Sequence, residues 1–220
     1  MDEQPASTKE RILAVAGDIF GEKGFKDTTI RLIAERARVN VAAINYHFRD
    51  KESLYAAILE EVFRTGFTRF PGDMGLPPQP SPQQRLRAFV RAMFYRLQSR
   101  EGWGGLAGRG RLIARELLSP SPAFEAMLDR YIKPHRDLLV DIIADIVAAP
   151  CPREKLLPCA ISIIGQCIYY AVAAPVIGLI SPVNAPNEHN LDRLAEFVWV
   201  FSLGGIAAVS ATITTPKETP

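Results

Sequence analysis

The sequence predicts an all-α protein built of two helical domains, and three observations support this fold class. Apolar residues recur every three or four positions along nearly the whole chain, which is the period of an amphipathic helix. No segment shows the alternation typical of a half-buried strand, and we find no internal repeat. The stretch Pro71–Pro82 holds five of the 17 prolines and interrupts the helical pattern, so it is expected to be a connector between domains.

The first and fourth helices have clear start signals. Ser7 and Glu10 form a capping-box pattern, so a helix is expected to begin at Ser7 and to end before Gly24. Asp50 can cap a longer helix over residues 50–70, which would link the two domains. The N-terminal domain is therefore expected to end near residue 55.

Two short helices are expected between these two. Thr28 or Thr29 can cap a helix that ends near Arg38, and a turn of a few residues then leads to a helix over Val41–His47. Isolated helices shorter than about 12 residues are marginal, so Val41–His47 must be stabilised by packing. A short helix, a tight turn and a second short helix, supported by a preceding helix, form the architecture that places a recognition helix in the major groove of DNA.

The second domain is expected to span residues 71–220 and to consist of amphipathic helices. Its first helix has an apolar face made of Leu86, Phe89, Val90, Met93, Phe94 and Leu97. The arginines of this helix are expected to lie mostly off that face: Arg85, Arg87, Arg91, Arg96 and Arg100. Five glycines in Glu101–Gly110 break the pattern, a helix resumes over Arg111–Leu118, and the Ser-Pro pair before residue 123 can start the next one.

No charged residue occurs between Lys155 and Glu188, and the apolar segment Leu156–Ile180 is long enough to cross a membrane. Phe197–Ile213 is a second such segment. A membrane-associated helical protein is therefore one alternative. Gln166, Pro158 and the many small residues favour two helices buried in the four-helix bundle of a dimer, so we expect no membrane insertion.

Composition excludes several classes of protein. Hydrophobic residues make up 48% of the chain and charged residues 23%, which is typical of a globular protein, and the polar N-terminus does not resemble a signal peptide. A cytoplasmic, nucleoid-associated protein is expected. Three cysteines without close spacing predict neither a disulfide framework nor a metal site, and no cofactor is implied. No nucleophile, base and orienting group occur together, so we do not expect an enzyme.

The residues from Thr28 to Tyr55 resemble the signature of the TetR family of transcription regulators, in which a conserved pattern spans the turn, the reading helix and the start of the next helix. The resemblance covers residues 7–60. Residues 115–120, Pro134 and Gln166 are similar to the CecR-like subgroup. The resemblance implies a repressor that binds a palindromic DNA operator as a homodimer and senses a small-molecule effector. An adaptor that has lost DNA binding is the other alternative.

The same resemblance indicates which residues contact DNA. Thr29 and Arg31 can reach phosphates at a helix N-terminus, and Lys51 resembles the phosphate-binding lysine of the family. Asn45 stands where many relatives have tyrosine, and its amide can pair with adenine. The full set of expected DNA contacts is Thr29, Arg31, Asn40, Val41, Ala42, Ala43, Asn45, Tyr46, His47 and Lys51.

The effector is expected to bind among the helices of the second domain, where apolar pockets contain a few polar groups. The aromatic and polar candidates for this pocket are Phe94, Trp103, Phe124, Met127, Tyr131, Gln166 and Tyr169. The arginine-rich helix could attract an anionic ligand or lie near DNA, although such a run of charge is usually a solvated face.

Overall fold

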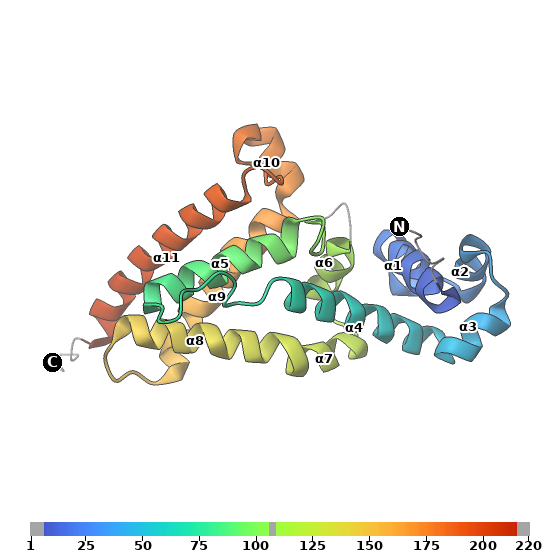
Figure 1. Ribbon diagram of the computed structural model, residues 1–220, viewed down its shortest axis with the longest axis horizontal. Coiled ribbons are helices and arrows are strands. Elements are labelled where there is room, and N and C mark those ends of the chain that lie inside the picture. The colour runs from blue at the N-terminus through green and yellow to red at the C-terminus, as the bar shows by residue number, and fades with distance from the viewer. Residues whose placement is uncertain (1–6, 106–108, 215–220) are drawn as a thin grey trace.

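The computed structural model describes residues 7–105 and 109–214, and every regular element within them is helical, which confirms the all-α prediction. Three helices form a head at one end of an elongated molecule, and a fourth helix leads from the head into a larger body (Figure 1). The head consists of α1 (Thr8–Asp27), α2 (Ile30–Ala37) and α3 (Val41–Phe48), and α4 (Lys51–Arg69) is the connecting helix. The body consists of α5 (Pro82–Gln98), α6 (Gly110–Leu118), α7 (Pro122–Met127), a π-helical turn (Leu128–Ile132), α8 (Lys133–Val147), α9 (Arg153–Val172), α10 (Ala174–Ile180), a 3-10 turn (Pro182–Asn184) and α11 (Leu191–Thr214).

Local capping signals set most of the helix starts. The Ser7–Glu10 capping box begins α1, and the Asp50 carboxylate accepts a hydrogen bond from the Ser53 backbone N–H (2.7 Å) at the start of α4. Ser121 caps α7, with proline at the first helical position as expected. These boundaries agree with the sequence because each depends on residues within one turn of the helix end.

The end of α1 differs from the prediction. Gly24 interrupts the helix with a left-handed backbone angle (φ 82°), but one further turn continues to Asp27. The Thr28 hydroxyl donates to the Gly24 carbonyl (2.7 Å) and stabilises this turn. A long-range contact to the Phe25 carbonyl, described below, holds it from outside, which is why the sequence pattern alone did not reveal it.

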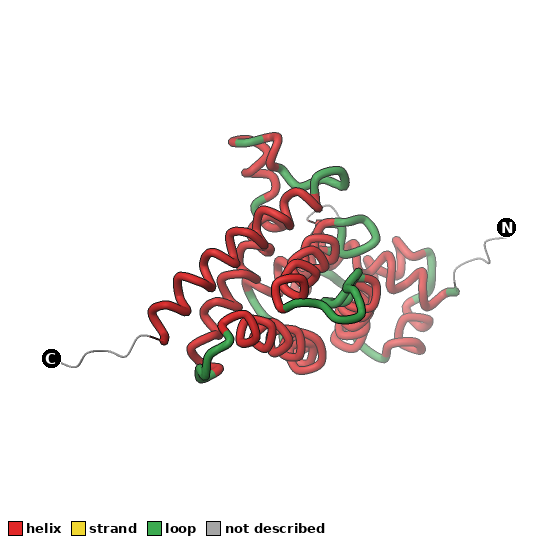
Figure 2. The backbone as a smooth tube through the Cα atoms, turned by 60° about the vertical axis from the view of Figure 1, so that its left-hand side comes forward, coloured by secondary structure: helices red, strands yellow, loops and turns green. Residues whose placement is uncertain are grey.

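Helix α5 lies at the centre of the body and packs against α8, α9 and α11 (Figures 1 and 2). Its predicted apolar face, which includes Leu86, Phe89 and Phe94, is buried. The prediction is wrong for Arg96, which was expected, with the other arginines of this helix, mostly off the buried face. Its side chain is only 1% exposed. It follows Met93 by three residues and Phe89 by seven, so it lies at the margin of the apolar stripe, where α4 covers it.

The two long apolar segments form α9 with α10, and α11. Both α9 and α11 are long and apolar enough to cross a membrane, with mean hydropathies of 1.4 and 1.7, although the structure contains no membrane. Only one face of each helix is buried within the chain. The exposed large apolar side chains on these helices include Ile161, Tyr169, Val172, Phe197, Val200 and Phe201.

Candidate nucleic-acid interface

Helices α2 and α3 are held as a unit by the core of the head. Ile33 and Ala37 of α2 and Ile44 and Phe48 of α3 are all buried in the cluster that contains the apolar face of α1. Arg38 makes the turn in a left-handed conformation (φ 53°), and its backbone N–H donates to two carbonyls near the end of α2. The short reading helix is thus anchored on one face, as the sequence predicted.

Two of the expected DNA contacts also cap helices. The Thr29 hydroxyl accepts a hydrogen bond from Leu32 N–H (3.2 Å) at the start of α2, and the Asn40 side-chain oxygen accepts one from Ala43 N–H (2.6 Å) at the start of α3. Both side chains are exposed. The Thr29 O–H and the Asn40 amide N–H groups therefore remain able to donate to phosphate while the oxygen atoms fix the helix ends.

The outer face of α3 is a continuous exposed surface. Tyr46 is 86% exposed, and its ring meets the His47 ring edge-on with centroids 5.2 Å apart. Ala43 and His47 are half-buried. The exposed members of the predicted set on α2 and α3 are Arg31, Val41, Ala42, Asn45 and Tyr46.

Lys51 has an internal role that the sequence did not predict. Its ammonium group donates to the carbonyls of Phe25 (3.0 Å) and Thr28 (3.1 Å) and lies 4.3 Å from the centre of the Phe25 ring. Two of its three N–H groups therefore join the start of α4 to the end of α1. A phosphate contact would use the remaining N–H group.

The head is joined to the body through two adjacent residues of α6. The Arg115 guanidinium donates to the carbonyls of Gly21 (3.1 Å) and Glu22 (2.8 Å) in α1. Glu116, which is 3% exposed, accepts hydrogen bonds from the Tyr55 hydroxyl of α4 and from Ser121 N–H (2.8 Å). Burial, followed by the Glu116 hydrogen bond, raises the pKa of Tyr55, so its hydroxyl remains protonated.

Sequence reasoning did not identify this junction as functional, although residues 115–120 had been singled out for their resemblance to the CecR-like subgroup. The sequence feature that could have indicated the junction is the Arg115-Glu116 pair, which is followed by the end of the helix at Ser119. The partners of the pair lie 61 and about 94 positions away in the chain, beyond the reach of helical periodicity.

The structure does not bring the predicted effector residues into one pocket. Trp103, Phe124 and Tyr131 gather around Phe63, with ring centroids 5.3, 5.9 and 5.7 Å from it. A cavity beside Trp103 measures about 10 Å³, which is too small for an effector.

The remaining candidates lie elsewhere. Phe94 is buried against Tyr170, with ring centroids 5.4 Å apart, and Met127 is buried in α7. Gln166 borders an open groove between α9 and α11, and Tyr169 is exposed on α9. The predicted set is therefore split between the interior of the body and the outer surface of α9, because a single sequence does not fix which face of α9 turns inward.

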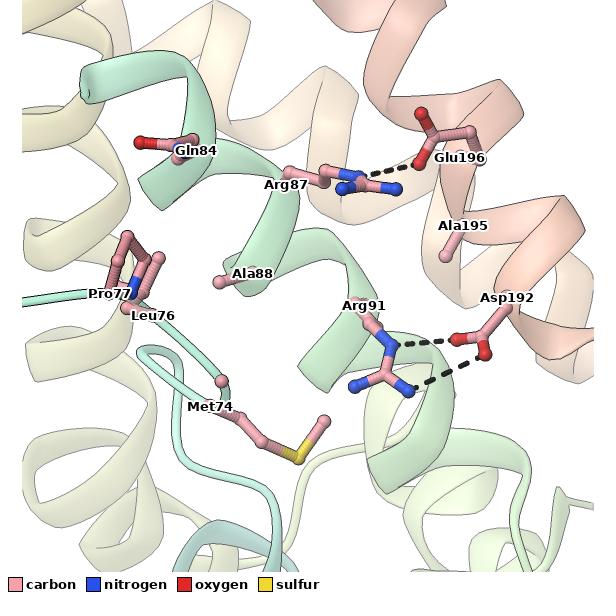
Figure 3. Close-up of a pocket in the computed structure, with 11 residues that line it drawn as sticks. Met74, Leu76, Pro77, Gln84, Arg87, Ala88, Arg91, Asp192, Ala195 and Glu196 are labelled. Atoms are coloured by element: carbon pink, nitrogen blue, oxygen red, sulfur yellow. Dashed lines mark hydrogen bonds and ion pairs between the residues drawn. The ribbon is translucent and has the colours of Figure 1, made fainter. Parts of the chain in front are cut away.

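The arginine-rich face of α5 is neutralised by carboxylates of other helices. Arg87 pairs with Glu196 (2.7 Å) and Arg91 with Asp192 (2.7 and 3.4 Å), both across the gap to α11 (Figure 3). Hydrogen bonding by Arg91 lowers the pKa of Asp192, so this carboxylate stays ionised. An open cleft of about 380 Å³ lies between these pairs and the connector before α5. Because its charges are compensated, this face is a poor site for an anion or for DNA.

Within residues 7–105 and 109–214, no group of three or more histidine, cysteine or acidic side chains could hold a metal ion. The three cysteines are free thiols, and burial raises the pKa of Cys167 to about 12.

Two family models match the chain. Residues 12–58 match the family described as bacterial regulatory proteins, tetR family, and residues 82–206 match the C-terminal domain of the HTH-type transcriptional dual regulator CecR. The first match contains α2 and α3, and the second contains the helices of the body from α5 to most of α11.

Several similar proteins are described as HTH-type transcription regulators. The HTH-type transcriptional dual regulator CecR of Shigella flexneri is 27% identical over 206 residues, covering 86% of this chain and 87% of that protein. The HTH-type transcriptional repressor KstR2 of Mycolicibacterium smegmatis is 28% identical over 153 residues, covering 70% and 71%. The fold is similar to that of AibR, solved in complex with isovaleryl coenzyme A and operator DNA, with a TM-score of 0.62, 17% identity and coverage of 89% and 97%.

Proposed function

Because this chain belongs to the TetR family of bacterial transcription regulators, with a C-terminal domain of the CecR type, we propose that it represses transcription. It binds a palindromic DNA operator as a homodimer. When a small-molecule effector binds its body, the protein leaves that operator. It would act in the cytoplasm, on the nucleoid. The relatives are transcription regulators and not enzymes.

The observation that carries this proposal is the two-sided character of α3. Ile44 and Phe48 anchor its inner face in the core of the head, whereas Asn45 and Tyr46 on the other side are exposed and use no side-chain hydrogen bond of their own within the described residues. A rigidly held helix with a small-residue start and exposed polar groups is suited to enter the major groove. We assign base recognition to Asn45 and phosphate contact to Arg31 and Thr29.

The homodimer is supported by the apolar faces of α9 and α11. Phe197 and Phe201 are 62% and 61% exposed, and their rings stack with centroids 6.4 Å apart. Exposed apolar surface of this extent on two neighbouring helices is unfavourable in water and is typical of an interface. Pairing these two helices with the same helices of a second copy would form a four-helix bundle.

The dimer also supplies affinity. A single head that makes a few phosphate contacts would bind near the non-specific range of about 10⁻⁴–10⁻⁶ M, whereas specific regulators reach about 10⁻⁸ M or tighter by engaging two half-sites. Two copies held by their bodies place two copies of α3 at a fixed spacing, which a palindrome can match.

The membrane alternative makes a different prediction for the same helices. If α9 and α11 entered a bilayer, the protein would need detergent for extraction. The proposal expects instead a detergent-free dimer in sedimentation, since the same surfaces would be covered by the second copy.

DNA binding is tested by fluorescence anisotropy with DNA from the region upstream of the protein's own gene. We expect salt-sensitive binding, with Arg31→Ala weakening all sequences about equally and Asn45→Ala weakening the operator more than altered operators. Lys51→Ala is unsuitable as a phosphate control because it would also release α1 from α4. Equal losses for Asn45→Ala on every sequence would refute base recognition, and a complete lack of binding would favour the adaptor alternative.

A further inference from the structure

Arg96 is a buried cation without a counter-charge. Its side chain is 1% exposed, and none of the ion pairs found in the described part of the chain includes it. The guanidinium donates to the Phe70 carbonyl (2.5 Å) and approaches the Met93 sulfur (3.6 Å), whereas its Nε–H has no acceptor among the residues that the structure describes. Burial lowers its pKa to about 9, but it stays charged at neutral pH.

This arrangement is the reverse of what the rest of α5 shows. Arg85, Arg87 and Arg91 lie at the surface, where a partner contributes little, and each pairs with a carboxylate within 2.5–2.7 Å. Arg96 is in the interior, where an unpaired charge is costly. The negative end of the α4 helix dipole, at Phe70, offsets only part of that charge and occupies only one of the donors.

The groups around Arg96 are aromatic and neutral. The guanidinium carbon lies 3.8 Å from the centre of the Phe67 ring, and Phe67 in turn packs on His135 and Tyr131, with centroids 4.1 and 5.5 Å away. Burial and the charge of Arg96 lower the pKa of His135 to about 4, so its imidazole is neutral. Glu60 is already bound by Tyr131 and Arg130, so it does not compensate Arg96.

We propose that Arg96 is the anchor for the anionic group of the effector, and that the effector is a small apolar carboxylate whose carboxylate pairs with the guanidinium while its tail lies among the surrounding aromatic rings. This inference rests on the proposed function, since it names the chemical class of the effector. A guanidinium binds a carboxylate through two parallel hydrogen bonds, and such a pair would satisfy the orphaned Nε–H. Phe67, Tyr131 and His135 are only half-buried, so the guanidinium lies one layer of rings beneath the surface.

The effector would replace the hydrogen bond from Arg96 to the Phe70 carbonyl, and this bond provides a route by which effector binding could change the position of the head. Arg96 holds Phe70, the residue that caps the end of α4, and this helix begins at Lys51 and carries Tyr55, both of which contact the head or its junction. Drawing the guanidinium away from Phe70 would free the end of α4 that lies in the body. A shift of α4 would then change the position of α3.

The test measures thermal unfolding of the purified full-length protein, without DNA, in the presence of 3-phenylpropionate or octanoate and of the matching neutral alcohols, 3-phenylpropanol and octanol. We expect the carboxylates to raise the melting temperature and the alcohols not to do so, because a ligand that binds only the folded state stabilises it. Arg96→Met should weaken carboxylate binding at least about tenfold, with an unliganded melting temperature equal to or above that of the wild type. Arg87→Met, on the same helix, should keep the carboxylate effect.

Three results would overturn the inference: no stabilisation by either carboxylate, equal stabilisation by the alcohols, or full retention of the effect in Arg96→Met. A fall in the unliganded melting temperature of Arg96→Met would instead assign Arg96 a purely structural role at the end of α4. These outcomes are independent of the operator-binding assay. A protein that binds DNA but no carboxylate refutes only this inference, and one that binds carboxylates but no DNA refutes the proposed function.

Discussion

The hydrogen bond between Tyr55 and Glu116 joins the connecting helix to the body, and Tyr55→Phe removes it with little other change. The phenyl ring would keep its contacts with Phe20 and Phe25, whose centroids lie 4.9 and 5.0 Å away. Glu116 would keep its bond from Ser121 but would lose the partner of its second oxygen while staying buried. Losing such a bond costs about 1–3 kcal/mol.

For a chain of this length that cost corresponds to a melting temperature lower by roughly 2–12 °C. Circular dichroism at one fixed protein concentration measures it, because the stability of a dimer depends on concentration. Tyr46→Phe is the matched control, since its hydroxyl lies on an exposed side chain and its removal should change stability by less than about 0.5 kcal/mol. Equal melting temperatures for Tyr55→Phe and the wild type would show that the junction does not depend on this bond.

Three further predictions concern packing, pH and assembly. Gly66→Ala should destabilise the protein by about 1–3 kcal/mol, since its Cβ would lie 2.4 Å from the Trp103 ring nitrogen. Gly17→Ala, whose Cβ would have its nearest contact at 3.6 Å, should be neutral or stabilising. Urea unfolding measures both variants, and equal stabilities would contradict the close packing of Gly66 against Trp103. The pKa of His135 is lowered to about 4 in the folded protein, so below pH 6.5 the unfolded chain binds a proton that the folded chain does not, and stability that is present above pH 6.5 is lost towards pH 4. His135→Gln should reduce this loss of unfolding free energy by on the order of 1–2 kcal/mol after solvent screening. Identical profiles of unfolding free energy against pH for the variant and the wild type would refute the assignment. Phe201→Glu should convert the proposed dimer to a monomer in sedimentation, whereas Leu118→Glu, an exposed change on α6, should leave it intact. A Phe201→Glu variant that still sediments as a dimer would exclude this face as the interface.

Much of the head could be predicted from the sequence because its signals are local. The capping residues Ser7 and Asp50 and the spacing of Ile33, Ile44 and Phe48 define helix starts and buried faces within one or two turns. The boundaries and the inner face of α3 depend on nothing more distant than the neighbouring helices. The family signature then predicts which outer residues contact DNA.

The environments of three other side chains, in α4, α5 and α9, could not be predicted in the same way, because they depend on long-range contacts. Lys51 looks like a free surface lysine until the carbonyl of Phe25, 26 positions away, is found beside it. Arg96 looks solvated in the sequence because the helical pattern of α5 does not show that Phe67 of α4 and the capping residue Phe70 cover the margin of its apolar face. Gln166 was grouped with the aromatic residues for its chemistry, but the orientation of α9 places it in the outer groove.

In the proposed function, two copies of α3 read a palindrome. Selection of bound sequences from a library of random duplex DNA by the purified protein tests it most directly. We expect an inverted repeat whose half-sites are centred about one helical turn of DNA apart, or a multiple of it, and the Asn45→Ala variant should lose preference at one base pair in each half-site. Enrichment of a single unrepeated site, or of no sequence at all, would contradict recognition of a palindrome by two copies of α3.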